Sequence, residues 1–191
     1  DRTRGFVRTI VQRRSFPIVI DADGLNSLSP WPNDIKGSEK LPIILTPHPG
    51  EMLRLLGTED KSVLLDRVTT AREFATSHQV ILVLKGSRSI IATPEGRVIV
   101  NPTGNAGLGT AGAGDTLTGI IAGFIGQEYA NKQENANPVD ATLAALFVSG
   151  MAGDVAAQKL GMRTMVASDI REHFSDAIRR LDPQGELPAI G

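Results

Sequence analysis

Three short apolar runs, each followed at once by polar residues, constrain this chain more than any other feature. They read "FPIVIDADG", "PIILTPHPGE" and "VILVLKGS". Uninterrupted aliphatic runs of this length are typical of strands buried on both faces, as in parallel sheets. Segments with helical apolar spacing lie before and between them. The sequence therefore predicts an α/β fold, with a mainly parallel central sheet flanked by helices.

The other expected elements follow from periodicity and turn signals. "IIATPEGRVIV" predicts a hairpin. Because "RTRGFVRTIVQRR" is helical from the start and the chain begins with Asp1, we expect the N-terminal portion of the domain to be missing. With no repeat or linker, residues 1–191 are interpreted as one domain. Helices are expected at residues 2–13, 50–56, 62–77, 114–128, 138–160 and 168–181, the last with Ser168 as its N-cap.

Composition excludes several classes of function. Hydrophobic residues make up 41% of the chain, which is typical of a packed globule. The net charge of −1, from 20 basic and 21 acidic residues, gives no electrostatic reason to expect nucleic acid or a membrane surface as partner. The absence of cysteine excludes disulfides and thiolate metal sites and is compatible with the cytoplasm, where we expect the protein.

Polar side chains follow each apolar run, where ligands bind in open parallel sheets. Because parallel strands end at the same edge, we expect all of these side chains to share one rim. Asp21 and Asp23 are also plausible turn residues and receive no role. The set comprises Asp21 and Asp23 after the first run, His48 and Glu51 after the second, and Lys85 and Ser87 after the third.

The glycine-rich segment "GLGTAGAGDTLTG", residues 107–119, allows two interpretations. Its Gly-x-Gly-x-x-Gly spacing suggests a dinucleotide fingerprint, which requires a strand directly before it and a second strand after its helix. Six residues separate the preceding strand from Gly107, and no second strand follows. The favoured interpretation is an anion site. Small residues leave the backbone N–H groups at a helix N-terminus uncovered, so that these groups can bind an anion. Asp115 in the first turn is then a helix cap or a proton acceptor beside a phosphoryl group.

The ordered motifs "VIDADGLN", "LTPHPGEM", "LVLKGS" and "GNAGLGTAGAGDTLTGIIAG" resemble the ADP/ATP-dependent NAD(P)H-hydrate dehydratases of the ribokinase-like superfamily. The resemblance covers residues 1–181 and implies a ribokinase-like three-layer sandwich. It also implies a nucleotide-repair reaction: ADP or ATP phosphorylates the ring hydroxyl of hydrated NADH or NADPH (NADHX or NADPHX), and phosphate then leaves. Many bacterial members carry an epimerase domain before this one, and members often form homo-oligomers. Both features are open for this chain.

The resemblance also implies roles for individual residues. Mg²⁺ is the implied cofactor. Ala113 stands where the family more often has Thr, which makes the loop more like those of sugar and vitamin kinases. The implied catalytic residue is Asp115; the substrate contacts are His48 and Asp115; the nucleotide contacts are Lys85, Gly86, Ser87, Arg88, Ser89 and Gly114; the anion hole is Gly112, Ala113 and Gly114; and Glu51 holds the metal through water.

Simpler roles remain open for several of these residues. His48 is also compatible with a loop histidine bonded to backbone, Glu51 with a residue favouring a helix N-terminus, and Lys85 with a solvated strand end. His78 and His173 show no pattern and are predicted to lie at the surface.

Two competing functions also remain open. One is a small-molecule kinase of the same superfamily, which would release its phosphorylated product. The other is a nucleotide-binding module without catalysis.

Overall fold

The computed structural model describes residues 2–132 and 135–182. Its centre is a five-stranded sheet in which the spatial order of the strands follows the sequence. The first three strands are parallel, whereas the fourth is antiparallel to the third and the fifth is antiparallel to the fourth. The predicted hairpin and the parallel arrangement of the three apolar runs are therefore confirmed, while the sheet as a whole is mixed, with two parallel and two antiparallel pairings. The strands are β1 (Ile18–Ile20), β2 (Ile43–Leu45), β3 (Ile81–Leu84), β4 (Ile90–Ala92) and β5 (Val98–Val100).

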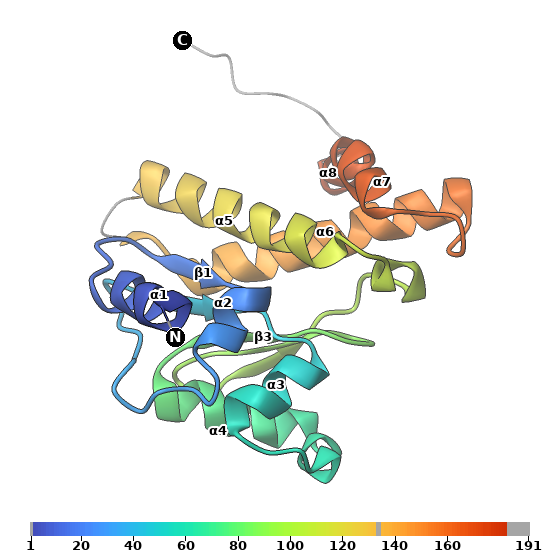
Figure 1. The fold of residues 1–191 in the computed structure, drawn as a ribbon. Coiled ribbons are helices and arrows are strands. Elements are labelled where there is room, and N and C mark those ends of the chain that lie inside the picture. The colour runs from blue at the N-terminus through green and yellow to red at the C-terminus, as the bar shows by residue number, and fades with distance from the viewer. Residues whose placement is uncertain (1, 133–134, 183–191) are drawn as a thin grey trace.

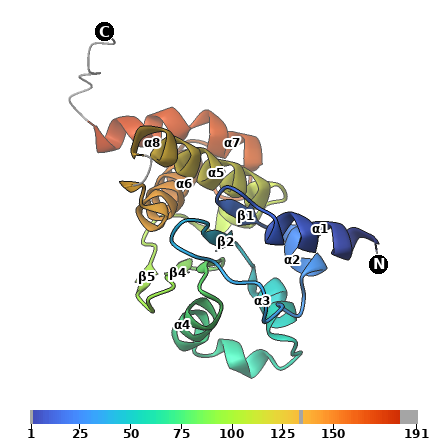
Figure 2. The same ribbon diagram turned by 90° about the vertical axis from the view of Figure 1, so that its left-hand side faces the viewer.

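Helices cover both faces of the sheet, so the molecule has three layers (Figures 1 and 2). Helices α5 and α6 pack on one face, while α3 and α4 lie on the other, with α1 and α2 beside β1. The helices are α1 (Arg2–Gln12), α2 (Ala22–Ser27), α3 (Pro49–Leu56), α4 (Arg67–His78), α5 (Ala113–Lys132), α6 (Pro138–Leu160), α7 (Ala167–Glu172) and α8 (Phe174–Leu181), with 3₁₀ turns η1 (Lys61–Leu64) and η2 (Ala106–Gly109).

The apolar runs form the core because their side chains alternate between the two faces. In β2, Ile43 and Leu45 face the layer that contains α4, while Ile44 faces α5 and α6. Strand β3 alternates in the same way, and its four residues are at most 1% exposed. Burial on both faces explains why these strands contain no polar residue.

The parallel strands bring their carboxyl ends to one edge, as expected. Asp21, Thr46 and Lys85 directly follow β1, β2 and β3. The N-terminus of α5 meets the same edge, because Thr118 on its second turn donates a hydrogen bond to Asp21. The sheet thus gathers residues from four distant segments around one rim.

Two of the expected helices are interrupted. Residues 62–77 form η1 and then α4, because Asp66 caps α4 by accepting a bond from the Thr69 N–H at 3.0 Å. The last helix divides into α7 and α8 at His173, whose ring nitrogen Nδ1 lies 2.8 Å from the Asp169 carbonyl oxygen. The prediction of Ser168 as N-cap is wrong: α7 begins one residue earlier, and Asp169 accepts the N–H of Val166 at 2.7 Å.

His78, predicted to lie at the surface, is half-buried. Its ring packs 4.6 Å from the Phe74 ring and 6.3 Å from that of Trp31, and its Nδ1 is buried without a hydrogen-bond partner among the described residues. The pKa of His78 is lowered mainly by burial of the ring and, to a smaller extent, by the positive charge of Lys36.

Helix α6 is long and apolar enough to cross a membrane by length and composition alone. In the fold, 61% of its most apolar window is buried. It packs against α5, α7 and α8, so its apolar character is that of a core helix.

Candidate active site

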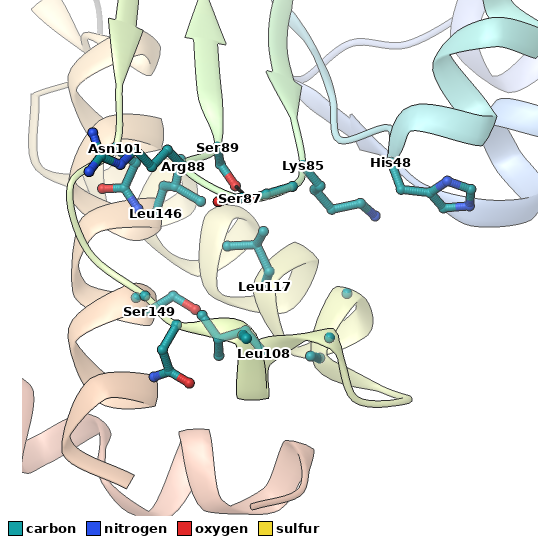
Figure 3. A pocket seen from close by; sticks show the side chains of 18 of the residues that line it. His48, Lys85, Ser87, Arg88, Ser89, Asn101, Leu108, Leu117, Leu146 and Ser149 are labelled. Carbon is teal, nitrogen blue, oxygen red and sulfur yellow. Dashed lines mark hydrogen bonds between the residues drawn. The ribbon is translucent and has the colours of Figure 1, made fainter. Parts of the chain in front are cut away.

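A cavity of about 870 Å³ opens between the carboxyl ends of the strands and the helices α5 and α6 (Figure 3). One part of its wall is polar and includes His48 and the loop from Lys85 to Ser89. Another part is apolar. The size of the cavity and its mixed polar and apolar lining suit a nucleotide or a comparable organic ligand. The apolar wall is formed by Leu108, Leu117, Leu146 and Ile170, with Ala113, Gly114, Asn101 and Ser149 also exposed to the cavity.

Lys85 is the centre of the charged network at the rim. Its ammonium group lies 2.8 Å from Oδ1 of Asp21 and 3.8 Å from Oε2 of Glu51. The Asp21 side chain is 8% exposed and that of Lys85 is 19% exposed, so solvent screens this ion pair less than a surface pair. Lys85 is thus held in place while remaining part of the cavity wall.

Asp21, which the sequence places at the rim without a role, is a functional candidate in the structure. Its second oxygen, Oδ2, accepts a hydrogen bond of 2.8 Å from the Thr118 hydroxyl. Burial alone would raise the pKa of Asp21, but the bonds from Lys85 and Thr118 and the charge of Lys85 outweigh it and lower the pKa. The carboxylate is therefore the stable form, and it links β1, β3 and α5. By contrast, Asp23 is exposed at the start of α2.

His48 and Glu51 form a reciprocal capping box at the start of α3. The His48 N–H donates to Oε2 of Glu51 at 2.7 Å, and Nδ1 of His48 accepts bonds from the N–H groups of Gly50 and Glu51. Because Nδ1 accepts, these hydrogen bonds assign the ring proton to Nε2, on the partly exposed edge of the ring. His48 also lines the cavity, so capping and a site role coexist in one residue.

The glycine-rich segment before α5 places the N-terminus of this helix at the cavity. Gly112 has a φ of +83°, which favours glycine, and the helix begins at the next residue, Ala113. A Cβ on Gly114 would lie 3.5 Å from Nζ of Lys85 and 3.6 Å from Oδ2 of Asp21. An anion bound at this helix end would therefore lie beside the Lys85 ammonium.

Asp115 is exposed in the first turn of α5, next to Gly114. Ala113 and Gly114 line the cavity, whereas Gly112, Asp115 and Glu51 are adjacent to it rather than part of its wall. The structure thus groups the predicted residues around one helix terminus. The individual roles of these residues remain predictions.

The loop before α5 is held by a buried helix. Asp154 on α6 accepts bonds of 2.9 Å from the Gly104 N–H and from the Asn105 side chain. Asn105 in turn caps η2 by accepting from the Gly107 N–H. These bonds give Asn105 a structural role and fix the segment that brings Leu108 to the cavity.

The three-layer α/β fold, with the N-terminus of α5 at the strand ends, is the fold of ribokinase-like proteins. A ribokinase-like superfamily protein from Enterococcus faecalis V583 shares this fold, with a TM-score of 0.66 and 23% identity over 91% of this chain and 58% of that chain. Within the class, residues 2–175 match the model of the NAD(P)H-hydrate dehydratase family. The chain therefore belongs to that family.

Relatives and a solved structure agree with this assignment. The bifunctional NAD(P)H-hydrate repair enzyme Nnr of Moorella thermoacetica is 42% identical over 96% of this chain and 33% of its own length. The ADP-dependent (S)-NAD(P)H-hydrate dehydratase of Bacillus subtilis is 33% identical over 87% of this chain and 55% of its own. The structure of an ADP/ATP-dependent NAD(P)H-hydrate dehydratase from Bacillus subtilis, co-crystallised with ATP and Mg²⁺, has a TM-score of 0.75 and 30% identity over 91% and 58% of the two chains.

This chain thus spans about a third of the bifunctional relatives that it matches and about half of the single-function ones.

Proposed function

We propose that this chain carries the catalytic residues of an ADP- or ATP-dependent NAD(P)H-hydrate dehydratase. The observation that carries the proposal is the meeting of the α5 N-terminus, Lys85 and His48 around one cavity. Family membership supports the reaction, because two relatives named above are NAD(P)H-hydrate dehydratases that use ADP or ATP.

In the proposed reaction, the ring hydroxyl of the hydrate attacks the terminal phosphoryl group of the nucleotide. An O–P bond forms, the bond to the departing nucleotide breaks, and the hydroxyl proton passes to the Asp115 carboxylate. The N–H groups around Ala113 and Gly114 and the Lys85 ammonium stabilise the negative charge on the transferring group. Phosphate then leaves with the C–O bonding electrons, and loss of a proton from the neighbouring carbon restores the double bond.

The residues near this site fit Mg²⁺ only through water and nucleotide phosphates. The described residues include no group of three His, Cys, Asp or Glu side chains that could hold a metal. Glu51 is 5% exposed, and one of its oxygens already accepts the His48 N–H. Mg²⁺ commonly keeps several waters and binds through one or two carboxylates plus phosphates, where it neutralises charge on the nucleotide. Glu51 is the carboxylate that we propose for this outer role.

The test is restoration of NADH or NADPH absorbance from the hydrate, with ADP and ATP supplied separately. Conversion of the hydrate with release of inorganic phosphate supports the proposal. Accumulation of a stable phosphorylated product would instead indicate a kinase. Stabilisation by nucleotide in a thermal shift assay without any product would indicate a binding module.

The assembly and location of the protein are separate proposals. Since its bifunctional relatives are longer, we propose an adjoining epimerase domain in the complete protein. Sequencing the complete gene tests that proposal. A homo-oligomer is testable by light scattering, and a cytoplasmic location by cell fractionation.

A further inference from the structure

We infer that Arg67 is a positioning residue for the loop from Lys85 to Ser89, an inference that rests on the proposed nucleotide-binding role of that loop. Arg67 is the first residue of α4 and lies outside the cavity wall. Its Nη1 donates to the Ser87 carbonyl at 3.0 Å, and its Nη2 donates to the carbonyls of Leu84 and Lys85 at 3.2 and 3.3 Å. One guanidinium therefore binds three carbonyl groups: that of Leu84, at the end of β3, and those of Lys85 and Ser87 in the loop.

The loop needs this support because its backbone conformation is unusual. Gly86 has a φ of +147°, and Arg88, which carries a side chain, has a φ of +54°. Non-glycine residues in the left-handed region persist only where surrounding contacts hold them. Arg67 also packs directly beneath Gly86, where an added Cβ would lie 3.0 Å from its Nη2. The backbone angle thus favours glycine at position 86, and a Cβ there would crowd the Arg67 guanidinium.

The carbonyl groups and the N–H groups of the Lys85–Ser89 loop have different partners. The carbonyls of Leu84, Lys85 and Ser87 turn to Arg67, whereas the N–H groups of Gly86, Ser87 and Arg88 form no bond to any residue that the structure describes. All of the residues from Lys85 to Ser89 line the cavity. Unpaired N–H groups bind phosphate oxygens, while unneutralised carbonyls repel them. Arg67 therefore acts through the loop on nucleotide affinity and not on the reacting atoms.

The geometry requires arginine rather than lysine at this position. A guanidinium presents several donors in a fixed plane, whereas an ammonium is a compact point charge on a flexible stem. The matched control is Arg72, on the same helix, whose Nε donates to the Gly96 carbonyl at 3.1 Å, in the turn between β4 and β5. Arg72 supports a turn in the same manner without touching the nucleotide loop.

The experiment compares wild-type protein with Arg67→Gln, Arg67→Lys and Arg72→Gln in the complete chain. Calorimetry measures ADP and ATP binding with Mg²⁺, steady-state kinetics separates KM from kcat, and hydrogen exchange follows the amides of residues 86–89. Arg67→Gln is expected to weaken nucleotide binding and raise KM by about 10- to 100-fold, with kcat changed by less than about threefold. Amide exchange in the loop should accelerate, and Arg67→Lys should recover only part of the affinity.

Each outcome decides the inference. Nucleotide affinity of Arg67→Gln within about twofold of wild type, or an equal loss in Arg72→Gln, overturns it. If Arg67→Gln does not fold, Arg67→Lys decides alone: full wild-type affinity contradicts the inference. If wild-type protein binds no adenine nucleotide, both the proposed function and the inference about Arg67 are wrong. Normal binding by wild type and by Arg67→Gln refutes the inference and leaves the proposed function intact.

Discussion

The ammonium group of Lys85 lies 2.8 Å from the carboxylate of Asp21, although 64 residues separate them in the sequence. The pair joins the ends of β1 and β3 and lies directly beside Gly114 at the start of α5. A positive charge is thereby held where a phosphoryl group would bind. This relationship links the stability of the rim to its chemistry.

Removing Asp21 should therefore affect both folding and binding. Asp21→Ala is expected to lower the free energy of unfolding by about 3 kcal/mol, because it leaves a largely buried ammonium without its nearest partner. Urea denaturation measures this change. The control is Asp23→Ala, at an exposed carboxylate two residues away, where the loss should stay below about 1 kcal/mol. Equal losses in the two variants would contradict the role given to the ion pair.

The same carboxylate predicts a pH dependence of stability. Because the pKa of Asp21 in the folded protein lies below its ordinary value of 3.8, the unfolded chain binds more protons in that range. The stabilisation is therefore complete above the ordinary value and is lost as the pH falls through the folded pKa. Unfolding free energies of wild type and Asp21→Asn should differ by a constant amount at neutral and mildly acidic pH. That difference should shrink only below pH 3.8; a difference that shrinks already near neutral pH would point to another group.

Asp115→Ala is expected to abolish turnover while nucleotide binding is largely kept. Its carboxylate is proposed to accept the hydroxyl proton, and general-base removal commonly costs about 10²- to 10⁴-fold in rate. Single-turnover kinetics and ADP calorimetry separate the two properties. Asp140→Ala, in the first turn of α6, is the control for simple loss of an acidic helix residue. Activity of Asp115→Ala within a few-fold of wild type would show that the assigned role is wrong.

Gly114→Ala should damage function without damaging the fold. The added Cβ would meet Lys85 and Asp21 at ordinary contact distances, so the protein is expected to fold. The methyl group nevertheless occupies the space in which a phosphate would approach the helix N–H groups. We expect nucleotide affinity to fall by about tenfold, as measured by calorimetry. Gly119→Ala on the same helix has no atom within 4 Å of the new Cβ and should leave affinity unchanged while stabilising the helix slightly.

Glu51→Gln tests the metal role separately from the capping role. A glutamine oxygen can still accept the His48 N–H, so the free energy of unfolding should change by less than about 1 kcal/mol. Loss of the carboxylate charge should raise the Mg²⁺ concentration for half-maximal activity by about tenfold. A magnesium titration that matches wild type would restrict Glu51 to its structural role.

Local patterns in the sequence were sufficient for much of the fold. Strands such as Ile81–Leu84 are apolar on both faces because they are buried on both faces, and that property is encoded within the strand itself. Helix interiors were equally predictable, because apolar spacing is a local property. Helix ends were less so: Ser168 had the right chemistry for a cap, but the α7 end was decided by a bond between Asp169 and Val166.

Side-chain partners across the fold required the tertiary structure. Asp21 and Asp23 are both acidic residues after the same strand, yet only Asp21 meets Lys85 and Thr118. His78 lacked any local pattern, although it packs against Phe74 and Trp31.

Local patterns in the chain are therefore enough to identify the α/β architecture, the family and the glycine loop at a helix N-terminus. The contact between Asp21 and Lys85, and those between Arg67 and the Lys85–Ser89 loop, appear only once the chain is folded. This difference arises from the sequence distance over which each interaction acts. Strand and helix periodicity arises between near neighbours, whereas an ion pair depends on how the layers pack.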